Sequence, residues 1–480
     1  MASLDETAFT RRLEEILVAQ LPFCRSLLAA DRLSGGASQE TYRLEIDCAD
    51  GRRALALRRA PGGGFDESSE ADRPGLAGEA QLMRSARAAG VPAPEVYYVL
   101  AEEDGLGAGF IMEWIDGEAL GARIVRGPEY AAIRPRLACE IGRILARIHS
   151  IDIPASGLEN YLTRIPAGQF IRQTWNRYIA LNTPQPMIDY TARWLSEHLV
   201  ETEDLVLVHN DFRTGNFMIT PERVVAVLDW EGAHIGDPLR DLGWICTNSW
   251  RYGGELPVGG FGSYEDLLRG YEEVSGRKVD VEQVRFWQVF GSFWWAVTCL
   301  DMVALFRDGP DGSVERASIG RRSSEALIDC VNMIIPGPVD LIGPGPGEPN
   351  LDMPGADELV AAVSDFLRTQ VMAETEGRTS FLARVSANAL DIVLRELSLH
   401  SEHRRRELAS LRSFYGSDGE ADLPGLRGRL VQSLRDGSQQ LNDERLTYHL
   451  RNTVVNQVAI DQPRYSGLKQ ALAIPAESSN

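Results

Sequence analysis

The chain has 480 residues, of which 44% are hydrophobic and 25% charged, the composition of a folded globular protein rather than a disordered one. A chain of this length is expected to form about two or three domains. Its formal net charge of -20 disfavours binding to nucleic acid or to an anionic membrane surface. The six cysteines lie far apart without a CxxC pair, which predicts reduced core residues rather than a disulfide or zinc framework.

The sequence offers little support for targeting or membrane insertion. Residues 1–21 contain interspersed charges, such as Arg11 and Glu14, and are typical of an amphipathic helix rather than a signal peptide. The best membrane candidate is residues 286–300, FWQVFGSFWWAVTCL, which is shorter than the roughly twenty apolar residues needed to cross a bilayer. We expect a buried helix there, and a cytoplasmic protein.

A run of strands is predicted near the N-terminus, over residues 33–57. Polar and apolar residues alternate over 41–46, as in a half-buried strand. Asp50-Gly51 is a favourable turn into a second strand that includes 53–58, so these two segments are expected to form a hairpin.

The loop before this hairpin contains two glycines. Gly35 and Gly36 would let backbone N–H groups and the Ser38 hydroxyl approach phosphate oxygens, although two glycines by themselves indicate only a turn. The sequence GxxxxGK[ST] does not occur in the chain, which excludes a P-loop. Residues 61–74, rich in glycine and acidic residues, are predicted to form a loop.

The next elements follow from apolar periodicity and from turn residues. A helix is predicted over 75–90, where Gly90 and Val91-Pro92 end it. Strands are expected at 96–100 and 110–113, before Asp116-Gly117 turns the chain into a more helical half. Helices are predicted over 135–150, 170–181 and 187–199.

The most informative stretch runs from Leu205 to Trp244. An apolar strand leads to His209-Asn210-Asp211, Asn216 follows five residues later, and a second apolar strand ends on Asp229. Two strands joined by a polar loop can place Asp211, Asn216 and Asp229 around one cavity. Phosphoryl transfer from ATP needs a carboxylate to orient or deprotonate the attacking hydroxyl and two oxygen ligands for Mg²⁺. Taken singly, all three are ordinary turn residues.

This pattern, with Gly236-Asp237-Pro238 after it, resembles the aminoglycoside phosphotransferase family, which is related to choline kinase and the protein kinases. The resemblance implies an α+β fold with two protein-kinase-like lobes. It also implies ATP and Mg²⁺ as cofactors and transfer of the γ-phosphoryl group to a hydroxyl of a small molecule. In this reading Asp211 is the catalytic base, and Asn216 and Asp229 bind magnesium.

The resemblance also assigns roles to the N-terminal half. Arg58 stands where relatives carry a strand lysine that contacts the nucleotide phosphates, and Arg-Arg before Ala-Pro resembles the branch fused to acyl-CoA dehydrogenases. Arginine keeps the charge but has a different reach. Glu79 stands where the family places the glutamate that pairs with this cation. Arg59 is expected on the opposite face of the strand. The alternatives are two solvated arginines and a surface glutamate.

Three further expectations concern the nucleotide and the loop that carries Asp211. The strand at 110–113 resembles the hinge between lobes, with Glu113 and Trp114 at the adenine slot and recognition through backbone groups. Asp241 is expected to accept hydrogen bonds from loop N–H groups, and His209 to orient the loop. His149 is expected to pack or to cap a helix rather than to bind a ligand.

The region after Trp244 is where the family places the acceptor pocket. It mixes aromatic residues, most of which must belong to the core, with arginines, and so favours a partly apolar or anionic acceptor over an aminoglycoside. The resemblance to the branch fused to acyl-CoA dehydrogenases implies a hydroxyacyl-CoA or another hydroxylated catabolite as the acceptor. The arginines are Arg251, Arg269, Arg307, Arg321 and Arg322.

The C-terminal part is predicted to be a separate all-α domain. Residues 336–355 are rich in proline and glycine and are predicted to form a linker. The predicted N-terminal lobe therefore covers 1–112, the C-terminal lobe 113–335 and the helical domain 356–480. This last part resembles an uncharacterised helical domain found behind some kinases of the family. Its five expected helices are 356–370, 380–399, 403–415, 423–435 and 443–460.

Two other functions remain open at this stage. A nucleotide-binding pseudokinase is favoured by Arg58 and by Asn210, where relatives often have glycine, but Asp211 and the two metal ligands argue against it. An interaction module built around the helical domain is the second alternative. The expected partner is a small-molecule acceptor, and the sequence does not predict an oligomeric state.

Overall fold

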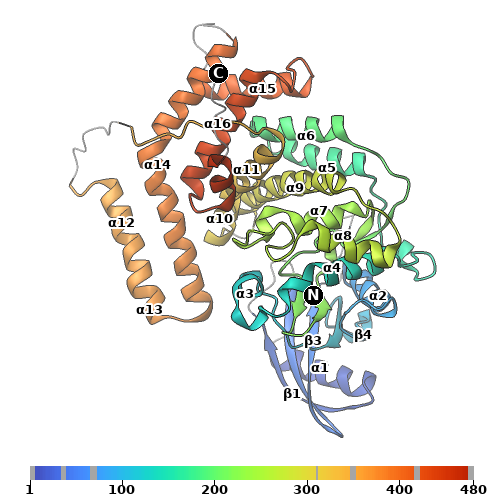
Figure 1. Cartoon of the computed structure of the whole chain (residues 1–480). Coiled ribbons are helices and arrows are strands. Elements are labelled where there is room, and N and C mark those ends of the chain that lie inside the picture. Colours follow the sequence, from blue (N-terminus) through green and yellow to red (C-terminus); the bar gives the residue numbers. More distant parts are fainter. Residues whose placement is uncertain are drawn as a thin grey trace. The chain divides into compact units, whose positions relative to one another are not determined.

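The structure is a computed structural model (Figure 1), and the chain divides into two compact units that are not continuous in sequence. The first unit comprises Met1–Ala167 and Glu201–Trp287. The second comprises Gly168–Val200 and Gln288–Asn480. The residues described are 6–33, 39–64, 73–309, 312–345, 353–415 and 422–473.

The first unit begins with helix α1 (Glu6–Gln20), as predicted, and an antiparallel sheet. Within the described residues the sheet has five strands in the order β1-β2-β3-β5-β4. Leu44 and Ile46 of β2 and Leu57 of β3 are fully buried on the α1 side. The strands are β1 (Cys24–Arg32), β2 (Glu40–Cys48), β3 (Gly51–Arg59), β4 (Val96–Val99) and β5 (Gly109–Glu113).

The predicted hairpin is confirmed as β2 and β3, and burial alternates residue by residue along β2. Gly51 has a φ of 122°, a backbone conformation that favours glycine, which explains the tight turn at Asp50-Gly51. The strand β1 was not predicted. It is an edge strand with two register irregularities and an uneven burial pattern, so its sequence lacks the alternation by which strands are recognised.

The rest of the first unit is largely helical. Helix α2 (Gly75–Ala88) and strands β4 and β5 occur where the sequence predicted them. Helix α4 (Arg134–His149) packs closely against α8 (Tyr264–Ser275). Glycines allow this approach: a Cβ on Gly142 would lie 2.1 Å from the carbonyl oxygen of Leu267, and one on Gly270 would lie 2.0 Å from that of Cys139.

The second unit is built from helices. Two of them, α5 (Ala167–Ala180) and α6 (Pro186–His198), precede the stretch that carries Asp211, as predicted. The others follow it, beginning with α9 (Val281–Asp308), which belongs to this unit from Gln288 onward. The remaining helices are α10 (Val314–Arg321), α11 (Ser323–Ile334), α12 (Ala356–Phe366), α13 (Met372–Glu374), α14 (Gly377–Tyr415), α15 (Leu423–Arg435), α16 (Glu444–Asp461) and α17 (Ser466–Leu472).

Helix α9 contains the segment predicted to be a buried helix. Among the described helices it alone is long and apolar enough to cross a membrane by length and composition. Phe293 is nevertheless fully buried, and the Phe290 ring centroid lies 4.9 Å from that of Phe170 in α5. These are the contacts of a core helix, as expected for residues 286–300.

The C-terminal helices differ from the prediction in two respects. The helices predicted over 380–399 and 403–415 form one continuous helix, α14, because no proline or glycine interrupts Ser401-Glu402-His403 between them. Helix α17 was not predicted, since its seven residues are too few to show a periodic pattern.

The predicted domain ranges do not coincide with the two units. In the described parts of 336–355, at 336–345 and 353–355, there is no helix or strand. However, contacts within the second unit join residues on both sides of this segment. Arg435 Nε lies 2.7 Å from Asp189 Oδ1, and Asn332 Nδ2 donates to the Gly467 carbonyl at 2.9 Å.

Candidate active site

Asp211 lies in a loop between two short strands, β6 (Val206–Val208) and β7 (Phe217–Ile219). Strand β7 pairs with β8 (Val224–Val227), and Asp229 follows two residues after β8. The Leu228 N–H donates to the Asn216 carbonyl at 2.7 Å, so the loop and the end of β8 are joined directly. The predicted arrangement is observed in part. Asp211 and Asn216 share one loop that is joined to the end of β8, but this loop leads into β7, and β6 pairs with β9 (His234–Gly236) rather than with β8.

Two residues of this region have left-handed backbone conformations. Asn210 has a φ of 67° and Asp229 a φ of 65°. Such conformations are uncommon for residues other than glycine, cost about 1–3 kcal/mol each, and cluster at functional sites. Hydrogen bonds hold both residues: Asn210 contacts Asp241 and Arg240, and Asp229 accepts from Arg58.

Asp241 fixes the start of the loop. Its carboxylate accepts the N–H groups of His209 at 2.8 Å and Asn210 at 2.7 Å, which confirms the role predicted for it. His149 Nε2 also contacts Asp241 at 3.0 Å, and its Nδ1 lies 2.9 Å from the Tyr271 hydroxyl. Burial alone would raise the pKa of Asp241, but hydrogen bonds from His149 and the backbone lower it below its usual range. Asp241 is therefore a buried anionic anchor.

His209 orients the loop, as predicted. Its Nε2 lies 3.0 Å from the Leu228 carbonyl, and the Asp211 N–H donates to its Nδ1 at 3.3 Å. A neutral ring with its proton on Nε2 satisfies both contacts. His209 is fully buried, so it links the loop to the end of β8 without facing substrate.

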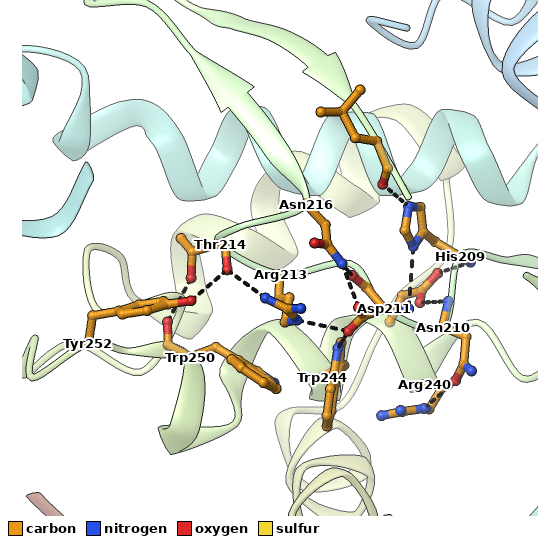
Figure 2. A network of polar contacts seen from close by, with 12 residues as sticks. His209, Asn210, Asp211, Arg213, Thr214, Asn216, Arg240, Trp244, Trp250 and Tyr252 are labelled. Carbon is orange, nitrogen blue, oxygen red and sulfur yellow. Dashed lines mark hydrogen bonds and ion pairs between the residues drawn. The ribbon is translucent and has the colours of Figure 1, made fainter. Parts of the chain in front are cut away.

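The carboxylate of Asp211 is held by three side chains (Figure 2). Its Oδ1 accepts from Trp244 Nε1 at 2.8 Å and from Arg213 Nε at 3.0 Å. Asn216 Nδ2 donates to the Asp211 carbonyl at 2.9 Å and also contacts Oδ2. About a quarter of the Asp211 side chain, 24%, remains exposed, so a substrate hydroxyl can reach a carboxylate whose orientation is already fixed.

Arginine side chains stack on the indole rings beside this carboxylate. Arg213 lies 4.3 Å from the centroid of Trp250, and the fully buried Arg240 lies 4.4 Å from that of Trp244. Arg240 Nε donates to Asn210 Oδ1 at 2.9 Å. Burial lowers the pKa of Arg240 to about 10, so it stays protonated at neutral pH. Both arginines thus carry positive charge close to Asp211.

Arg58 joins the N-terminal sheet to Asp229. Its Nη2 lies 2.7 Å from Asp229 Oδ1, and its Nε lies 3.4 Å from Glu79 Oε2. Gln39 lies between the two partners: its Oε1 accepts from Arg58 Nε, and its Nε2 donates to Glu79 Oε1 at 2.9 Å. The expected pairing of Arg58 with Glu79 is present as an ion pair.

The charges in this cluster depend on burial. Burial raises the pKa of Glu79 to about 7, because its attraction to Arg58 offsets only part of the desolvation. Burial opposes the charge of Asp229 as well, but Arg58 outweighs it and lowers the pKa of this carboxyl. Asp229 is therefore the stronger anionic partner of Arg58 at neutral pH.

Arg59 faces away from this cluster, as strand alternation predicted. Its Nε donates to Glu40 Oε2 at 2.8 Å, and its guanidinium lies 4.3 Å from the ring centroid of Phe9 in α1. The two adjacent arginines thus have different tasks. Arg58 faces Asp229, and Arg59 holds α1 against the sheet.

The two predicted magnesium ligands each keep one side-chain oxygen atom that could bind a metal ion. Asn216 turns its amide nitrogen toward Asp211, which leaves Oδ1 available, and Asp229 uses Oδ1 for Arg58. Within the described residues, no group of three or more His, Cys, Asp or Glu side chains is arranged to hold a metal. Mg²⁺ is usually held by one or two carboxylates together with waters and substrate phosphates, so a site of one amide and one carboxylate oxygen fits it.

Comparison with known proteins identifies this arrangement. The phosphotransferase enzyme family matches residues 30–276, just over half of the chain, and includes both the Arg58 cluster and the loop of Asp211. The chain belongs to this family. A domain of unknown function matches residues 373–465, within the helical C-terminal part. The predicted membership is confirmed.

The relatives of this phosphotransferase include much longer proteins. Acyl-CoA dehydrogenase family member 10 of Mus musculus is 32% identical over 261 residues, 52% of this chain and 22% of that protein. Acyl-CoA dehydrogenase family member 11 of Gallus gallus is 28% identical over 333 residues, 64% of this chain and 39% of that protein. The chain therefore spans well under half the length of these relatives.

A solved structure supports the fold of the phosphotransferase. A protein of Ralstonia eutropha, provisionally named an aminoglycoside phosphotransferase, is similar over 66% of this chain and 95% of its own. The TM-score is 0.55 and the sequence identity 24%. The predicted kinase-like α+β fold, with an additional helical C-terminal region, is confirmed.

The positions of the remaining predicted site residues do not test the nucleotide-binding roles predicted for them. Glu113 ends β5, and its N–H donates to the Glu95 carbonyl at 2.8 Å, so this group is already engaged. Trp114 follows it, with Arg43 5.4 Å from its ring centroid and Asp116 accepting from Nε1. Ser38 lies outside the described residues. The adenine and phosphate-loop assignments stay predictions.

Some residues that contact the predicted site were not predicted. Arg213 and Trp244 hold Asp211, Gln39 bridges Arg58 and Glu79, and Arg240 supports Asn210. Arg213 could have been predicted from its position only two residues after Asp211. Gln39 and Trp244 are distant in sequence from their partners, and no local pattern indicates them.

The arginines predicted for the acceptor region do not form one group. Arg251 is buried and donates to the Cys246 carbonyl at 2.9 Å, and Arg269 pairs with Asp266 at 2.6 Å. Arg307, Arg321 and Arg322 belong to the second unit. In the described residues of the first unit, the arginine on the Asp211 carboxylate is instead Arg213, stacked on Trp250.

Proposed function

We propose that this phosphotransferase transfers the γ-phosphoryl group of ATP to a hydroxyl of a small molecule, and that it requires Mg²⁺. The observation that carries the proposal is the Asp211 carboxylate, oriented by Trp244, Arg213 and Asn216 and still 24% exposed. In phosphoryl transfer the protein contributes mainly positioning and electrostatic stabilisation. A preoriented, accessible carboxylate beside two cationic side chains suits that task.

The chain's own residues define the steps. Asp211 orients the acceptor hydroxyl and accepts its proton as the hydroxyl oxygen bonds to the γ-phosphorus, while the bond from that phosphorus to the bridging oxygen breaks and ADP leaves. Arg58, now paired with Asp229, contacts phosphate oxygens when the nucleotide is bound. Asn216 and Asp229 would hold Mg²⁺, and the bound ion would supply positive charge next to the nucleotide phosphates.

For the acceptor we propose a hydroxyacyl-CoA or another hydroxylated catabolite rather than an aminoglycoside. Two observations support this choice. Relatives matching about half of this chain are named as acyl-CoA dehydrogenase family members. The Asp211 carboxylate contacts Arg213, which lies over the ring of Trp250, and this pair suits an anionic or apolar acceptor better than a polycationic sugar. We also propose a cytoplasmic location, which the buried, unpaired cysteines support.

The test is a transfer assay with matched variants. The protein is incubated with ATP and Mg²⁺ and panels of hydroxyacyl-CoAs, hydroxy acids and aminoglycosides, and mass spectrometry detects the gain of one phosphoryl group. Asp211→Asn should lower turnover roughly 10²–10⁴-fold with little change in ATP affinity. Asp204→Asn, at an exposed aspartate paired with Arg277, should not. Near-normal turnover in Asp211→Asn would remove this residue from the mechanism.

A nucleotide-binding pseudokinase is the second candidate. The contact of Arg58 with Asp229, a proposed metal ligand, favours it, because that contact would compete with metal binding. Calorimetric titration of ATP, once in the presence of Mg²⁺ and once in the presence of EDTA, distinguishes an active phosphotransferase from a pseudokinase. A pseudokinase of this kind would bind ATP equally well in EDTA and transfer no phosphoryl group to any acceptor.

A further inference from the structure

A large cavity lies within the second unit. Its volume is about 1240 Å³, above the roughly 300–1,000 Å³ of common small-molecule sites. Its walls come from α9, α10, α11, α14, α15 and α16 and from the turn between α5 and α6. All its lining residues belong to the second unit, and those on α14, α15 and α16 lie inside the domain of unknown function. This site therefore does not depend on the proposed phosphoryl transfer.

One set of lining residues is apolar and comes from several helices. Leu300 and Val303 line the cavity from α9, Leu408 from α14, Leu423 from α15 and Val454 from α16. Walls of this kind favour a ligand with an extended apolar body, because burying apolar surface on both sides releases water.

The lining also carries more positive than negative charge, in a chain whose net charge is -20. Some of its arginines are neutralised locally. Arg321 Nη2 lies 2.8 Å from Glu396, and Arg405 Nε lies 2.7 Å from Glu402. Arg427 is likewise paired with Glu407.

Two lining arginines remain without such a partner. Across the part of the chain that the structure describes, Arg307 and Arg404 have no carboxylate within ion-pair distance. Arg404 is exposed, on the stretch of α14 that lines the cavity. Its guanidinium is therefore available to an anionic group, which it can contact with two parallel N–H donors.

His400 adds a second, independent sign of a missing ligand. It lies one helical turn before Arg404 on α14 and lines the same cavity. Both of its ring nitrogens are inaccessible to solvent and have no hydrogen-bond partner among the described residues. Its Nδ1 is 3.6 Å from Glu396 Oε1, too far for a hydrogen bond. A buried polar group left unsatisfied in this way is costly and indicates a partner that is not part of the chain.

We propose that this cavity binds an amphipathic organic anion. Its apolar body lies along the leucine and valine side chains, and its anionic group contacts Arg404. A turn of the His400 ring would let one of its nitrogens donate a hydrogen bond to the same group. Carboxylate and phosphate head groups share this chemistry, since both accept bidentate arginine contacts. The helical region thus contributes a ligand site of its own.

Calorimetry on the full-length protein with decanoate, decyl phosphate and decanol tests the proposal. At least one of the two anions should bind more tightly than decanol, and the comparison between them identifies the preferred head group. Arg404→Gln should weaken binding of that anion about tenfold or more, the usual scale for a charge-assisted hydrogen bond, and leave decanol unchanged. Arg406→Gln, two positions along α14 and outside the cavity lining, is the matched control.

A second variant tests the apolar part of the site. Ala304→Trp places a large ring at a half-buried lining position of α9 and should weaken the binding of all three probes. The proposal is overturned if neither anion binds better than decanol, if Arg404→Gln and Arg406→Gln bind the anion equally well, or if Ala304→Trp leaves every affinity unchanged. Melting by circular dichroism confirms that the variants are folded.

Discussion

Arg58 shows how one side chain couples the sheet to the loops that follow it. It contacts Asp229 at 2.7 Å and Glu79 at 3.4 Å, whereas Arg59, its neighbour, contacts Glu40 on the other face. Arginine can do this because its planar guanidinium offers donors in several directions, which a lysine ammonium at the same place would not reproduce. Replacing Arg58 by lysine would therefore not be a conservative change.

Variants at this position should separate the two arginines. Arg58→Ala should lower ATP affinity or turnover more than Arg59→Ala, since only Arg58 faces the predicted site. Glu79→Ala should lower activity by releasing Arg58, so its effect should shrink once Arg58 is already replaced. A double-mutant cycle on turnover, at saturating and subsaturating ATP, measures this coupling. Additive losses at 58 and 79, or a larger loss at 59, would contradict the assignment.

Glu79 should also make stability depend on pH. Its pKa is raised by burial from 4.5 to about 7, so protonation favours the folded state. This contribution is fully present below pH 4.5, decreases as pH rises, and is lost above about 7. Glu79→Gln mimics the protonated form and lacks the change. Urea unfolding of the nucleotide-free protein measures this effect. As the pH rises from 4.5 to about 7, the free energy of unfolding of the wild type should fall relative to that of Glu79→Gln. A constant difference would show that burial does not control this carboxyl.

At the scale of elements, the loop that carries Asp211 is held by neighbouring helices as well as by its own hydrogen bonds. Asp241, in the first turn of α7 (Leu239–Cys246), accepts the N–H groups of His209 and Asn210. Helix α4 contributes His149, and α8 contributes Tyr271, to the same buried network. The close packing of α4 and α8 at Gly142 and Gly270 therefore helps to position the loop.

Replacing this anchor should disturb both stability and chemistry. In Asp241→Asn the amide nitrogen cannot accept a hydrogen bond, so one loop N–H loses its partner at a cost of about 1–3 kcal/mol. We expect lower turnover with a nearly unchanged KM for ATP, because the loop orients Asp211 and not the nucleotide. Chemical unfolding and steady-state kinetics measure the two effects, with Asp204→Asn as the exposed control. Unchanged stability together with unchanged turnover would show that the loop holds its shape without Asp241.

At the scale of the whole molecule, the second unit is assembled from segments far apart in sequence. Its helices α5 and α6 precede Asp211, whereas α9 to α17 follow it. Asp189 on α6 is fully buried and is satisfied by Trp175, Tyr178 and Arg435 together. The helices after residue 355 thus complete a core that begins much earlier in the chain.

A chain that ends at Pro336 should therefore be less stable than the full-length protein. It would leave Asp189 without Arg435, and breaking such a buried pair costs about 3–5 kcal/mol. Urea unfolding compares the two chains, and Arg435→Ala in the full-length protein isolates the pair. Arg445→Ala, at an exposed arginine, is the control. Equal unfolding midpoints for the short and full chains would show that the C-terminal helices fold independently, as the Pro/Gly-rich segment first suggested.

The sequence by itself determined the features that local patterns carry. Alternation predicted the hairpin β2–β3 and the opposite faces of Arg58 and Arg59, and the spacing from His209 to Asp229 predicted the loop and the family. Helical periodicity predicted most helices, but it could not show that two of them join into α14. These features depend on residues that are close together in the sequence, so a local pattern is enough to predict them.

Only the tertiary structure decided which distant residues meet. Trp244 on Asp211, Gln39 between Arg58 and Glu79, and Arg435 on Asp189 follow from packing, and no periodic pattern marks them. The boundary of the second unit also depends on packing. The linker was predicted from composition, whereas a compact unit is defined by contacts between residues that can be far apart in sequence. Composition and periodicity describe what each segment can form, and burial of complementary surfaces selects which segments pack together.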